Sequence, residues 1–258
     1  MKSTEKEEAY YGNWMPRTFI YICVALIIIP LILSVIFPWI VLKVILWVIS
    51  AFFIFPLVYI LGLYYFFSKN DGEIQHAIRN IVLEKLDWEG NGKVLDIGTG
   101  SGPLAINLAK KYPNSEAIGI DYWGKLWDYS LKLCENNANI EGVKDRVEFK
   151  RSSAANLPFE DEYFDAIVSN YVFHEVREVK DKSEVLKEAF RVLKKGGVFS
   201  LQDLFGNKRN YGTMEQLMEK IKSWNVEGVN YEKSLEIYQM PRFIKAEIGK
   251  TYVIYGKK

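Results

Sequence analysis

Hydrophobic and polar positions divide the chain into two unequal parts. The 50 residues from 18 to 67 carry one charge, Lys43, whereas 58 of the 65 charged residues lie in residues 68–258 and six lie in residues 1–17. The apolar run holds two stretches of the roughly 20 residues that a bilayer-spanning helix needs, on either side of a turn at 38–43. We predict a cytosolic segment at 1–17, a transmembrane hairpin with helices at 18–37 and 44–67, and one globular domain at 68–258.

Aromatic residues mark both ends of the predicted hairpin. A secretory signal peptide has an apolar core of only about 7 to 15 residues, so this run is too long to be one. Trp39 and Trp47 flank the turn, and further rings gather at the opposite ends, as is typical of aromatic belts at two membrane interfaces: Tyr10, Tyr11, Trp14, Tyr64 and Tyr65. The few lysines and arginines close to the spans do not decide the orientation.

The globular part alternates between strand and helix patterns. Apolar residues recur at helical spacing from residue 71 and stop before Gly90. Strands are then predicted at 93–97, 116–120, 147–151, 164–169, 198–202, 235–238 and 251–255, and helices at 103–111, 123–137 and 183–194. This order predicts an α/β fold, a doubly wound sheet of seven strands preceded by the two membrane helices.

Charge and cysteine content exclude several classes of partner. The chain has 33 lysines and arginines against 32 acidic residues, and no basic stripe that tracks phosphates, so we expect no nucleic-acid partner. Its two cysteines, Cys23 and Cys134, form neither a disulfide framework nor a metal-binding pair. We therefore expect no disulfide-linked partner, no metal and a domain that faces the cytosol.

A glycine-rich loop follows the first predicted strand. It reads Asp96-Ile-Gly98-Thr99-Gly100-Ser-Gly102, and Pro103 then opens a helix. Glycines allow close approach of a ligand, and amides at a helix start attract an anionic group. Asp121 ends the second strand, where a carboxylate accepts both hydroxyls of a ribose.

The spacing of the loop excludes the commonest nucleotide cofactors. A dinucleotide fingerprint that starts at Gly98 needs glycine at position 103, which is proline. A phosphate-binding P-loop needs a Gly-Lys-Ser/Thr sequence that is absent here. A nucleoside-containing cofactor other than NAD, ATP or GTP is predicted.

The loop and the segments that follow it resemble a known enzyme family. The DxGxGxG pattern is similar to that of the class I S-adenosylmethionine-dependent methyltransferases, and the likeness runs through residues 71–258. Further matching segments are Gly119-Ile-Asp121, Leu157-Pro-Phe159 followed by 164–170, and Leu193-Lys-Lys-Gly-Gly197. The end of the chain, 240–243 and 252–258, resembles the terminal hairpin of the ubiquinone/menaquinone-methyltransferase-like branch. The resemblance implies a Rossmann-like sheet and S-adenosylmethionine as cofactor.

The same resemblance assigns roles around the cofactor. The backbone of Gly98, Thr99, Gly100 and Gly102 would hold the methionine part, and Asp96 would orient the loop and the ammonium group. Asp121 would bind the ribose and Tyr122 would lie against the adenine. Ser153 stands where many relatives have an aspartate for the adenine amino group, and a hydroxyl accepts that bond less strongly than a carboxylate. The remaining cofactor-binding candidates are Ala154 and Asn170.

Candidate catalytic residues follow the fourth predicted strand. Methyl transfer is an in-line displacement that needs alignment, and it needs a base only where the nucleophile starts protonated. His174 is the candidate base because its ordinary pKa lies nearest neutrality, and the alternative is that it caps or packs the next turn. Asn170 and Tyr171 are the other candidates, while Asp203 either faces substrate or lies in a solvated loop. An Asn-Pro-Pro-Tyr motif is absent, which argues against DNA adenine or protein glutamine as acceptor.

These observations predict a membrane-anchored methyltransferase of a lipophilic small molecule, a quinone, isoprenoid or other lipid. Because S-adenosylmethionine is made and used in the cytosol, the resemblance places the domain and the N-terminus on the cytoplasmic side of the cell membrane. Two alternatives stay open. The hairpin is only an anchor and the acceptor is a soluble molecule or protein, or the domain is a nonenzymatic S-adenosylmethionine-binding regulator in a membrane complex.

Overall fold

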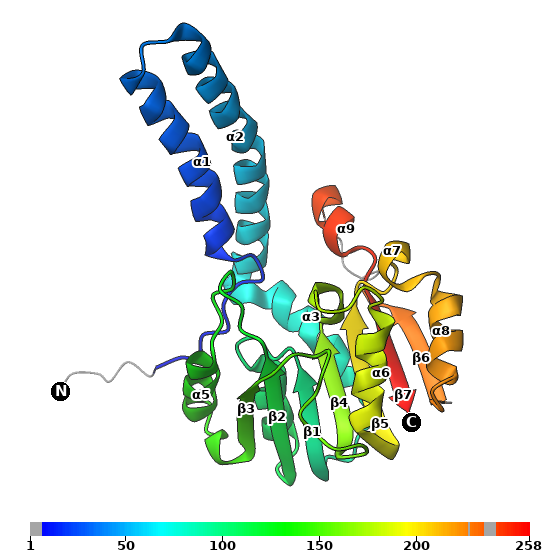
Figure 1. Cartoon of the computed structure of the whole chain (residues 1–258). Coiled ribbons are helices and arrows are strands. Elements are labelled where there is room, and N and C mark those ends of the chain that lie inside the picture. Colours follow the sequence, from blue (N-terminus) through cyan, green and yellow to red (C-terminus); the bar gives the residue numbers. More distant parts are fainter. Residues whose placement is uncertain (1–6, 227, 235–240) are drawn as a thin grey trace, which may run out of the picture. The chain divides into compact units, whose positions relative to one another are not determined.

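The computed structural model describes residues 7–226, 228–234 and 241–258, and it divides into two compact units (Figure 1). One unit holds the described residues up to Tyr11 together with 77–123 and 129–258. The other holds 12–76 and 124–128. The chain therefore passes between the units at four points, one of them directly after residue 11 and one directly after residue 123.

The second unit is built around two long apolar helices, α1 (Arg17–Ile36) and α2 (Ile40–Ser68). They lie side by side in Figure 1, joined by the indole of Trp47, which donates to Ser34 Oγ at 3.0 Å, and by Ser50 Oγ, which donates to the carbonyl of Ile27 at 3.0 Å. Both are long and apolar enough to cross a membrane, although two such helices are by themselves weak support for one that does.

The turn of this hairpin is shorter than the sequence predicts. Helix α2 begins at Ile40 rather than 44, and the amide of Lys43 already donates to the carbonyl of Trp39 at 3.0 Å. Lysine is a good helix former, so one charge in an apolar run does not delay the helix. The helix start at residue 44, predicted from the position of the charged Lys43, is therefore wrong.

Polar side chains tie together the segments that enter and leave the hairpin. Asn13 Nδ2 donates to the carbonyl of Tyr64 at 3.0 Å and to Ser68 Oγ at 2.8 Å. Gln75 accepts from the amide of Trp14 and donates to the carbonyl of Phe67. A short 3-10 helix, η1 (Lys69–Gly72), leads from α2 into α3 (Glu73–Glu84).

The first unit is a seven-stranded mixed sheet with the order β3-β2-β1-β4-β5-β7-β6. Strands β1 to β5 are parallel, and β7 runs antiparallel between β5 and β6. This arrangement confirms the predicted Rossmann-like α/β fold. The strands are β1 (Gly92–Ile97), β2 (Ser115–Asp121), β3 (Val147–Arg151), β4 (Phe164–Asn170), β5 (Leu193–Asp203), β6 (Gly228–Lys233) and β7 (Tyr252–Lys257).

Helices cover both faces of the sheet, because successive residues of a strand point to opposite sides. Leu95 and its neighbours pack on α6 (Ser183–Val192) and α8 (Met214–Lys222), whereas Val94 packs with α3, α4 (Pro103–Lys111) and α5 (Leu131–Ile140). The short elements are η2 (Lys144–Arg146), η3 (Phe173–Glu175), α7 (Lys208–Tyr211) and α9 (Arg242–Ile248).

The predicted bounds of α5, α6 and β5 differ from the structure, and one predicted strand cannot be compared with it. The helix predicted at 123–137 is wrong before residue 131, because Trp123 has a left-handed φ of 45° and Ser130 caps α5 by accepting from the amide of Leu133. Strand β5 begins at Leu193, so the preceding helix ends at Val192 rather than 194. The strand predicted at 235–238 lies outside the described residues, and the edge strand beside β7 is β6, whose mostly exposed residues show no buried alternation.

Candidate active site

The predicted site residues gather at the carboxyl ends of the parallel strands. Strands β1 and β4 are neighbours, while the chain continues from β1 to β2 on one side and from β4 to β5 on the other. In open α/β sheets a ligand crevice forms outside the carboxyl ends at such a switch point. The glycine loop leaves β1 there, and His174 follows β4 there.

The three glycines of the loop serve different purposes. All have left-handed φ values, of 72° at Gly98, 61° at Gly100 and 90° at Gly102. A Cβ at Gly98 would lie 2.0 Å from Val172, and one at Gly102 would lie 2.9 Å from Phe149, so packing requires glycine at both. At Gly100 the nearest atom would be 3.6 Å away, on Tyr129. This part of the loop is therefore the one that a ligand can approach closely.

The backbone amides of the loop bind within the protein rather than pointing to a ligand. Gly98 and Thr99 donate to the carbonyl of Ile120 at 2.8 and 2.9 Å, and Gly102 donates to the carbonyl of Thr99 at 2.8 Å. Gly100 donates to Asp121 Oδ2 at 2.9 Å. The sequence predicts free amides at the start of the following helix, and these four amides of the preceding loop are used to hold its shape.

Asp96 is a buried carboxylate with one oxygen unused. Its Oδ2 accepts from Thr99 Oγ1 at 2.6 Å and from the amide of Ala105 at 3.1 Å, whereas its Oδ1 is buried and has no partner among the described residues. Burial raises the pKa of Asp96 to about 7. A cationic donor beside Oδ1 would satisfy this oxygen and favour the ionised form.

Asp121 braces the loop and keeps accepting capacity. Its Oδ2 takes the Gly100 amide and its Oδ1 takes the amide of Trp123 at 2.7 Å, while burial raises its pKa. The Trp123 indole and the Cys134 thiol both donate to the carbonyl of Gly100, at 2.7 and 3.1 Å. Each carboxylate oxygen has a further lone pair, which suits a ribose with two hydroxyl donors.

A carboxylate that the sequence does not reveal lies beside Ser153. Ser153 Oγ donates to Glu178 Oε1 at 2.8 Å, and the charge reaches this place from a loop 25 residues further along the chain. Tyr122 is 61% exposed, with the guanidinium of Arg151 5.2 Å from its ring centre, and Ala154 is buried. No local pattern could have identified Glu178, because only the fold brings it next to Ser153.

His174 and Asp203 form a buried pair at the ends of β4 and β5. His174 Nδ1 lies 2.5 Å from Asp203 Oδ1, the His174 amide donates to Asp203 Oδ2 at 3.3 Å, and the Asp203 side chain is fully buried. Burial alone would lower the pKa of His174, but the charge and hydrogen bond of Asp203, with Glu175 at 3.4 Å from Nε2, raise it to about 10. Asp203 therefore faces His174 and does not lie in a solvated loop. At neutral pH His174 is an imidazolium, with both ring nitrogens protonated.

Further polar groups surround this pair. Thr251 Oγ1 uses its hydrogen to donate to the carbonyl of Ile248. The Tyr171 hydroxyl, 2.7 Å from Thr251 Oγ1, must therefore be the donor between them, which fixes the direction of its O–H. Asn170 Oδ1 accepts from Gln202 Nε2 at 2.8 Å. The hydroxyl of Tyr211 is buried without a partner among the described residues, and burial together with the charge of Asp203 raises its pKa.

The unused polar atoms fit the cofactor that the sequence suggests. Within the described residues six side chains have a buried nitrogen or oxygen without a partner, and Asp96, Gln202 and Tyr211 are among those at the carboxyl ends of the strands. Asp96 suits the ammonium and Asp121 the ribose of S-adenosylmethionine. No group of three or more candidate metal ligands occurs in the described part of the chain.

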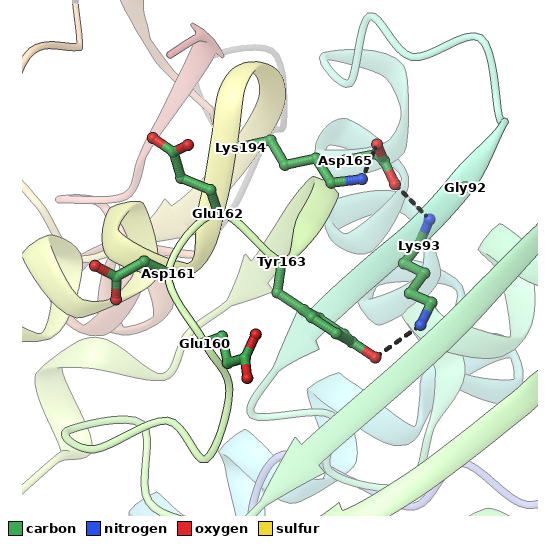
Figure 2. Close-up of a pocket in the computed structure, with 8 residues that line it drawn as sticks. All are labelled: Gly92, Lys93, Glu160, Asp161, Glu162, Tyr163, Asp165 and Lys194. Carbon is green, nitrogen blue, oxygen red and sulfur yellow. Dashed lines mark hydrogen bonds and ion pairs between the residues drawn. The ribbon is translucent and has the colours of Figure 1, made fainter.

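The hollow in Figure 2 lies at the opposite edge of the sheet. It has a volume of about 430 Å³ and is lined by the amino ends of β1 and β4 and the start of β5. Its charged groups from the strands are already paired: Asp165 takes the amide of Lys93 at 2.8 Å and Lys194 Nζ at 2.7 Å, and Lys93 Nζ donates to the Tyr163 hydroxyl. It is therefore not the candidate active site.

Comparison with known families agrees with this geometry. The profile of a family described as "Methyltransferase domain" matches residues 89–250. The chain belongs to this methyltransferase family, and its sheet is that of the class I S-adenosylmethionine-dependent methyltransferases.

Characterised relatives include quinone-modifying enzymes. The chain is 32% identical over 125 residues to the ubiquinone/menaquinone biosynthesis C-methyltransferase of Geotalea daltonii, covering 48% of this chain and 50% of that protein. It is 34% identical over 119 residues to the demethylmenaquinone methyltransferase of Lactiplantibacillus plantarum, covering 46% and 47%. The chain thus spans about half the length of the curated relatives it matches.

Solved structures share the fold at low identity. The geranyl diphosphate C-methyltransferase of Streptomyces coelicolor is 12% identical with a TM-score of 0.56, over 76% of this chain and 81% of that one. The [4+2]-cyclase SpnF is 20% identical with a TM-score of 0.56, over 74% and 84%. Because a cyclase shares it, the fold alone does not define the reaction, and the residues of the site must.

Proposed function

We propose that this protein is a membrane-anchored S-adenosylmethionine-dependent methyltransferase whose acceptor is a lipophilic small molecule with an acidic proton, such as a quinol or another phenol or enol. The observation that carries the proposal is the buried His174–Asp203 pair at the same sheet edge as the glycine loop. A proton-binding pair is needed only where the nucleophile starts protonated, and hydroxyl groups of this class do.

The residues divide the work between binding and proton transfer. Bound S-adenosylmethionine would supply an electrophilic methyl group. Asp96 and Asp121 would bind its ammonium and ribose, and the buried Asp203 fixes the imidazole ring of His174 through Nδ1. The acceptor oxygen would meet His174 Nε2, which takes its proton as the oxygen or a conjugated carbon becomes nucleophilic.

The raised pKa of His174 sets a condition on this proposal. With a pKa of about 10, His174 is an imidazolium at neutral pH. It must therefore lose a proton from Nε2 before it can accept the proton of the acceptor. A phenol with a pKa near 10 competes for that proton on almost equal terms. The pair and the acceptor would then share one proton, which supports a phenolic or enolic acceptor over an amine.

Chain connectivity supports a link between the membrane segment and the cofactor loop. Asn137 pairs with both backbone groups of Tyr10, accepting from its amide at 3.0 Å and donating to its carbonyl at 2.9 Å. Ser101 Oγ donates to the carbonyl of Tyr11 at 2.8 Å. The chain that docks on the glycine loop here continues directly into the hairpin unit, and α3 leads back from it.

Relatives named for lipophilic acceptors support the same class of substrate. Besides the quinone enzymes, a sterol 4-C-methyltransferase of Caenorhabditis elegans is 26% identical over 202 residues, covering 71% of this chain and 56% of that protein. We propose that the hairpin concentrates the enzyme where such acceptors dissolve, with the domain and both termini in the cytoplasm.

The acceptor class is tested with the whole chain in lipid vesicles. Removing the hairpin would also detach the segment that docks on Ser101, so a truncated protein would confound two effects. Purified protein is incubated with methyl-labelled S-adenosylmethionine and either a lipid extract or a soluble metabolite extract, with His174→Ala as control. Label in the lipid fraction that disappears in the variant supports the proposal. Label confined to soluble molecules would make the hairpin a mere anchor, and cofactor binding without any transfer would indicate a regulator.

Membrane topology is tested separately by cysteine labelling. Both native cysteines are buried, so single cysteines introduced as Trp39→Cys at the turn and Lys258→Cys at the C-terminus give clean signals. In intact cells a membrane-impermeant maleimide should label the turn and reach the C-terminus only after permeabilisation. Labelling of both positions in intact cells would contradict the cytoplasmic assignment.

A further inference from the structure

Arg79 is a buried cation with no carboxylate partner among the described residues. It lies on α3, is 4% exposed, and its Nε is buried with no hydrogen-bond partner among the described residues. The groups whose charge acts on it are the phenols of Tyr129 and Tyr11, and no carboxylate is among them. Burial lowers its pKa to about 10, which still leaves it positive at neutral pH.

Such a group is unusual in a folded protein. Arginine is almost never fully buried unless it is paired, because removing an unpaired charge from water is costly. By contrast, the partly exposed Arg191 is held by Glu188 and Asp161. Arg79 is therefore placed to meet an anion that the described residues do not provide.

The surroundings of Arg79 place it beside the glycine loop. Tyr11, one of its two phenol neighbours, accepts through its carbonyl from Ser101, and Tyr129, the other, is the residue nearest to the open side of Gly100. The preceding residue, Ile78, accepts from Gln202 Nε2 at 3.0 Å, at the carboxyl end of β5. All these residues belong to the sheet unit.

We propose that Arg79 binds the α-carboxylate of S-adenosylmethionine. The amino-acid part of this cofactor is a zwitterion, and the loop region offers one unpaired group of each sign: Asp96 Oδ1 for the ammonium and the guanidinium of Arg79 for the carboxylate. A planar guanidinium binds a carboxylate through two parallel hydrogen bonds, which also fixes its orientation. The inference rests on the cofactor assignment and does not depend on the acceptor.

The test compares S-adenosylmethionine with its decarboxylated analogue, which lacks only the carboxylate. Calorimetric binding of each is measured with the full-length wild type in detergent and with Arg79→Met, Arg79→Lys and Arg177→Met. Arg177 is an exposed arginine, so its variant controls for the change in net charge. The wild type should bind S-adenosylmethionine at least tenfold more tightly than the analogue, as should Arg177→Met. Arg79→Met should lose this preference, chiefly by binding S-adenosylmethionine more weakly, and Arg79→Lys should keep part of it.

Thermal unfolding without ligand provides a second readout. Because Arg79→Met removes an unpaired buried charge, its unfolding midpoint should equal or exceed that of the wild type, while the upward shift produced by S-adenosylmethionine should shrink. Undiminished preference for the carboxylate in Arg79→Met would overturn the proposal and would point to an anionic group on the acceptor instead. A wild type that binds both ligands equally would also overturn it. A wild type that binds neither would overturn the cofactor assignment as well.

Discussion

The two halves of the site are built in different ways. The cofactor half, at the ends of β1 and β2, consists mainly of backbone and of residues close together in sequence, such as Asp96, Thr99 and Gly100. The acceptor half, at the ends of β4 and β5, consists of side chains from distant segments: His174 meets Asp203 across 29 positions, and Tyr171 meets Thr251 across 80. The first half is thus recognisable as a motif, and the second exists only once the sheet has formed.

This difference has a chemical reason. Binding a nucleoside and an amino acid needs a close backbone approach and two acidic side chains, which the glycine loop and the ends of β1 and β2 supply. Keeping a buried imidazole protonated needs charged side chains on more than one side of the ring. A single short segment cannot supply all of them. If the halves are independent as well as different, substitutions in one should leave the other unchanged.

The largest effect is expected from His174→Ala. Loss of a general base lowers kcat by about 10²- to 10⁴-fold. The Kd for S-adenosylmethionine should stay within about twofold of the wild type, because the hydrogen bonds and ion pairs described for His174 go to Asp203 and Glu175 and not to the glycine loop. Initial rates with a labelled lipid acceptor and calorimetry with the cofactor check both statements. A parallel loss of cofactor binding would show that the halves are coupled.

The converse variant is Asp121→Ala. Losing the net contribution of one hydrogen bond to a carboxylate, about 1.5–3 kcal/mol, lowers cofactor affinity by roughly 10- to 100-fold, which is the minimum that we expect. The substitution also frees the amides of Gly100 and Trp123, which loosens the loop. Asp121→Asn should retain part of the affinity, and Glu135→Ala on the exposed face of α5 should retain all of it. Equal binding by Asp121→Ala and the wild type would remove Asp121 from the cofactor site.

The pH dependence of the rate tests the acceptor half alone. Since the pKa of His174 is raised to about 10, the fraction of enzyme with a neutral imidazole increases about tenfold per pH unit below that value. We expect kcat/KM to rise with the same slope. Asp203→Asn removes the main cause of the increase in pKa, so the rising limb should move to lower pH. A rate that falls with increasing pH would instead mean that the imidazolium is the active form. The same measurement in Asp121→Ala should show an unshifted limb.

The smallest effect concerns the cofactor half. Burial raises the pKa of Asp96 to about 7, and a bound ammonium favours the ionised carboxylate. Cofactor affinity should therefore fall as the pH drops below about 7, by at most tenfold per unit. Calorimetry between pH 5.5 and about 8 with the wild type and Asp96→Asn checks this, because the variant has no group to titrate there and its affinity should be nearly constant. An equal slope in both proteins would assign the dependence to another group.

The outcome for individual residues follows the same division. Glycine spacing together with the family resemblance indicates Asp96, Gly98, Gly100, Gly102 and Asp121, and the structure brings them together in one region. Sequence patterns also indicated His174 but left its role open, because its partner lies on another strand. Glu178 and Arg79 carried no signal at all, since neither stands in a motif and their importance comes from what surrounds them.

The sequence by itself determined the parts of this protein that depend on neighbours along the chain. These are the apolar hairpin helices, the alternation of strands and helices, and the glycine loop, since helix periodicity, strand alternation and turn chemistry are all local. Tertiary structure decided which segment forms the edge strand beside β7 and which charged side chains are buried together. It placed β6 beside β7, Asp203 against His174 and Arg79 away from any carboxylate. Burial and pairing, which set the pKa values and hence the chemistry, depend on residues far apart in sequence, so they exist only in the folded chain.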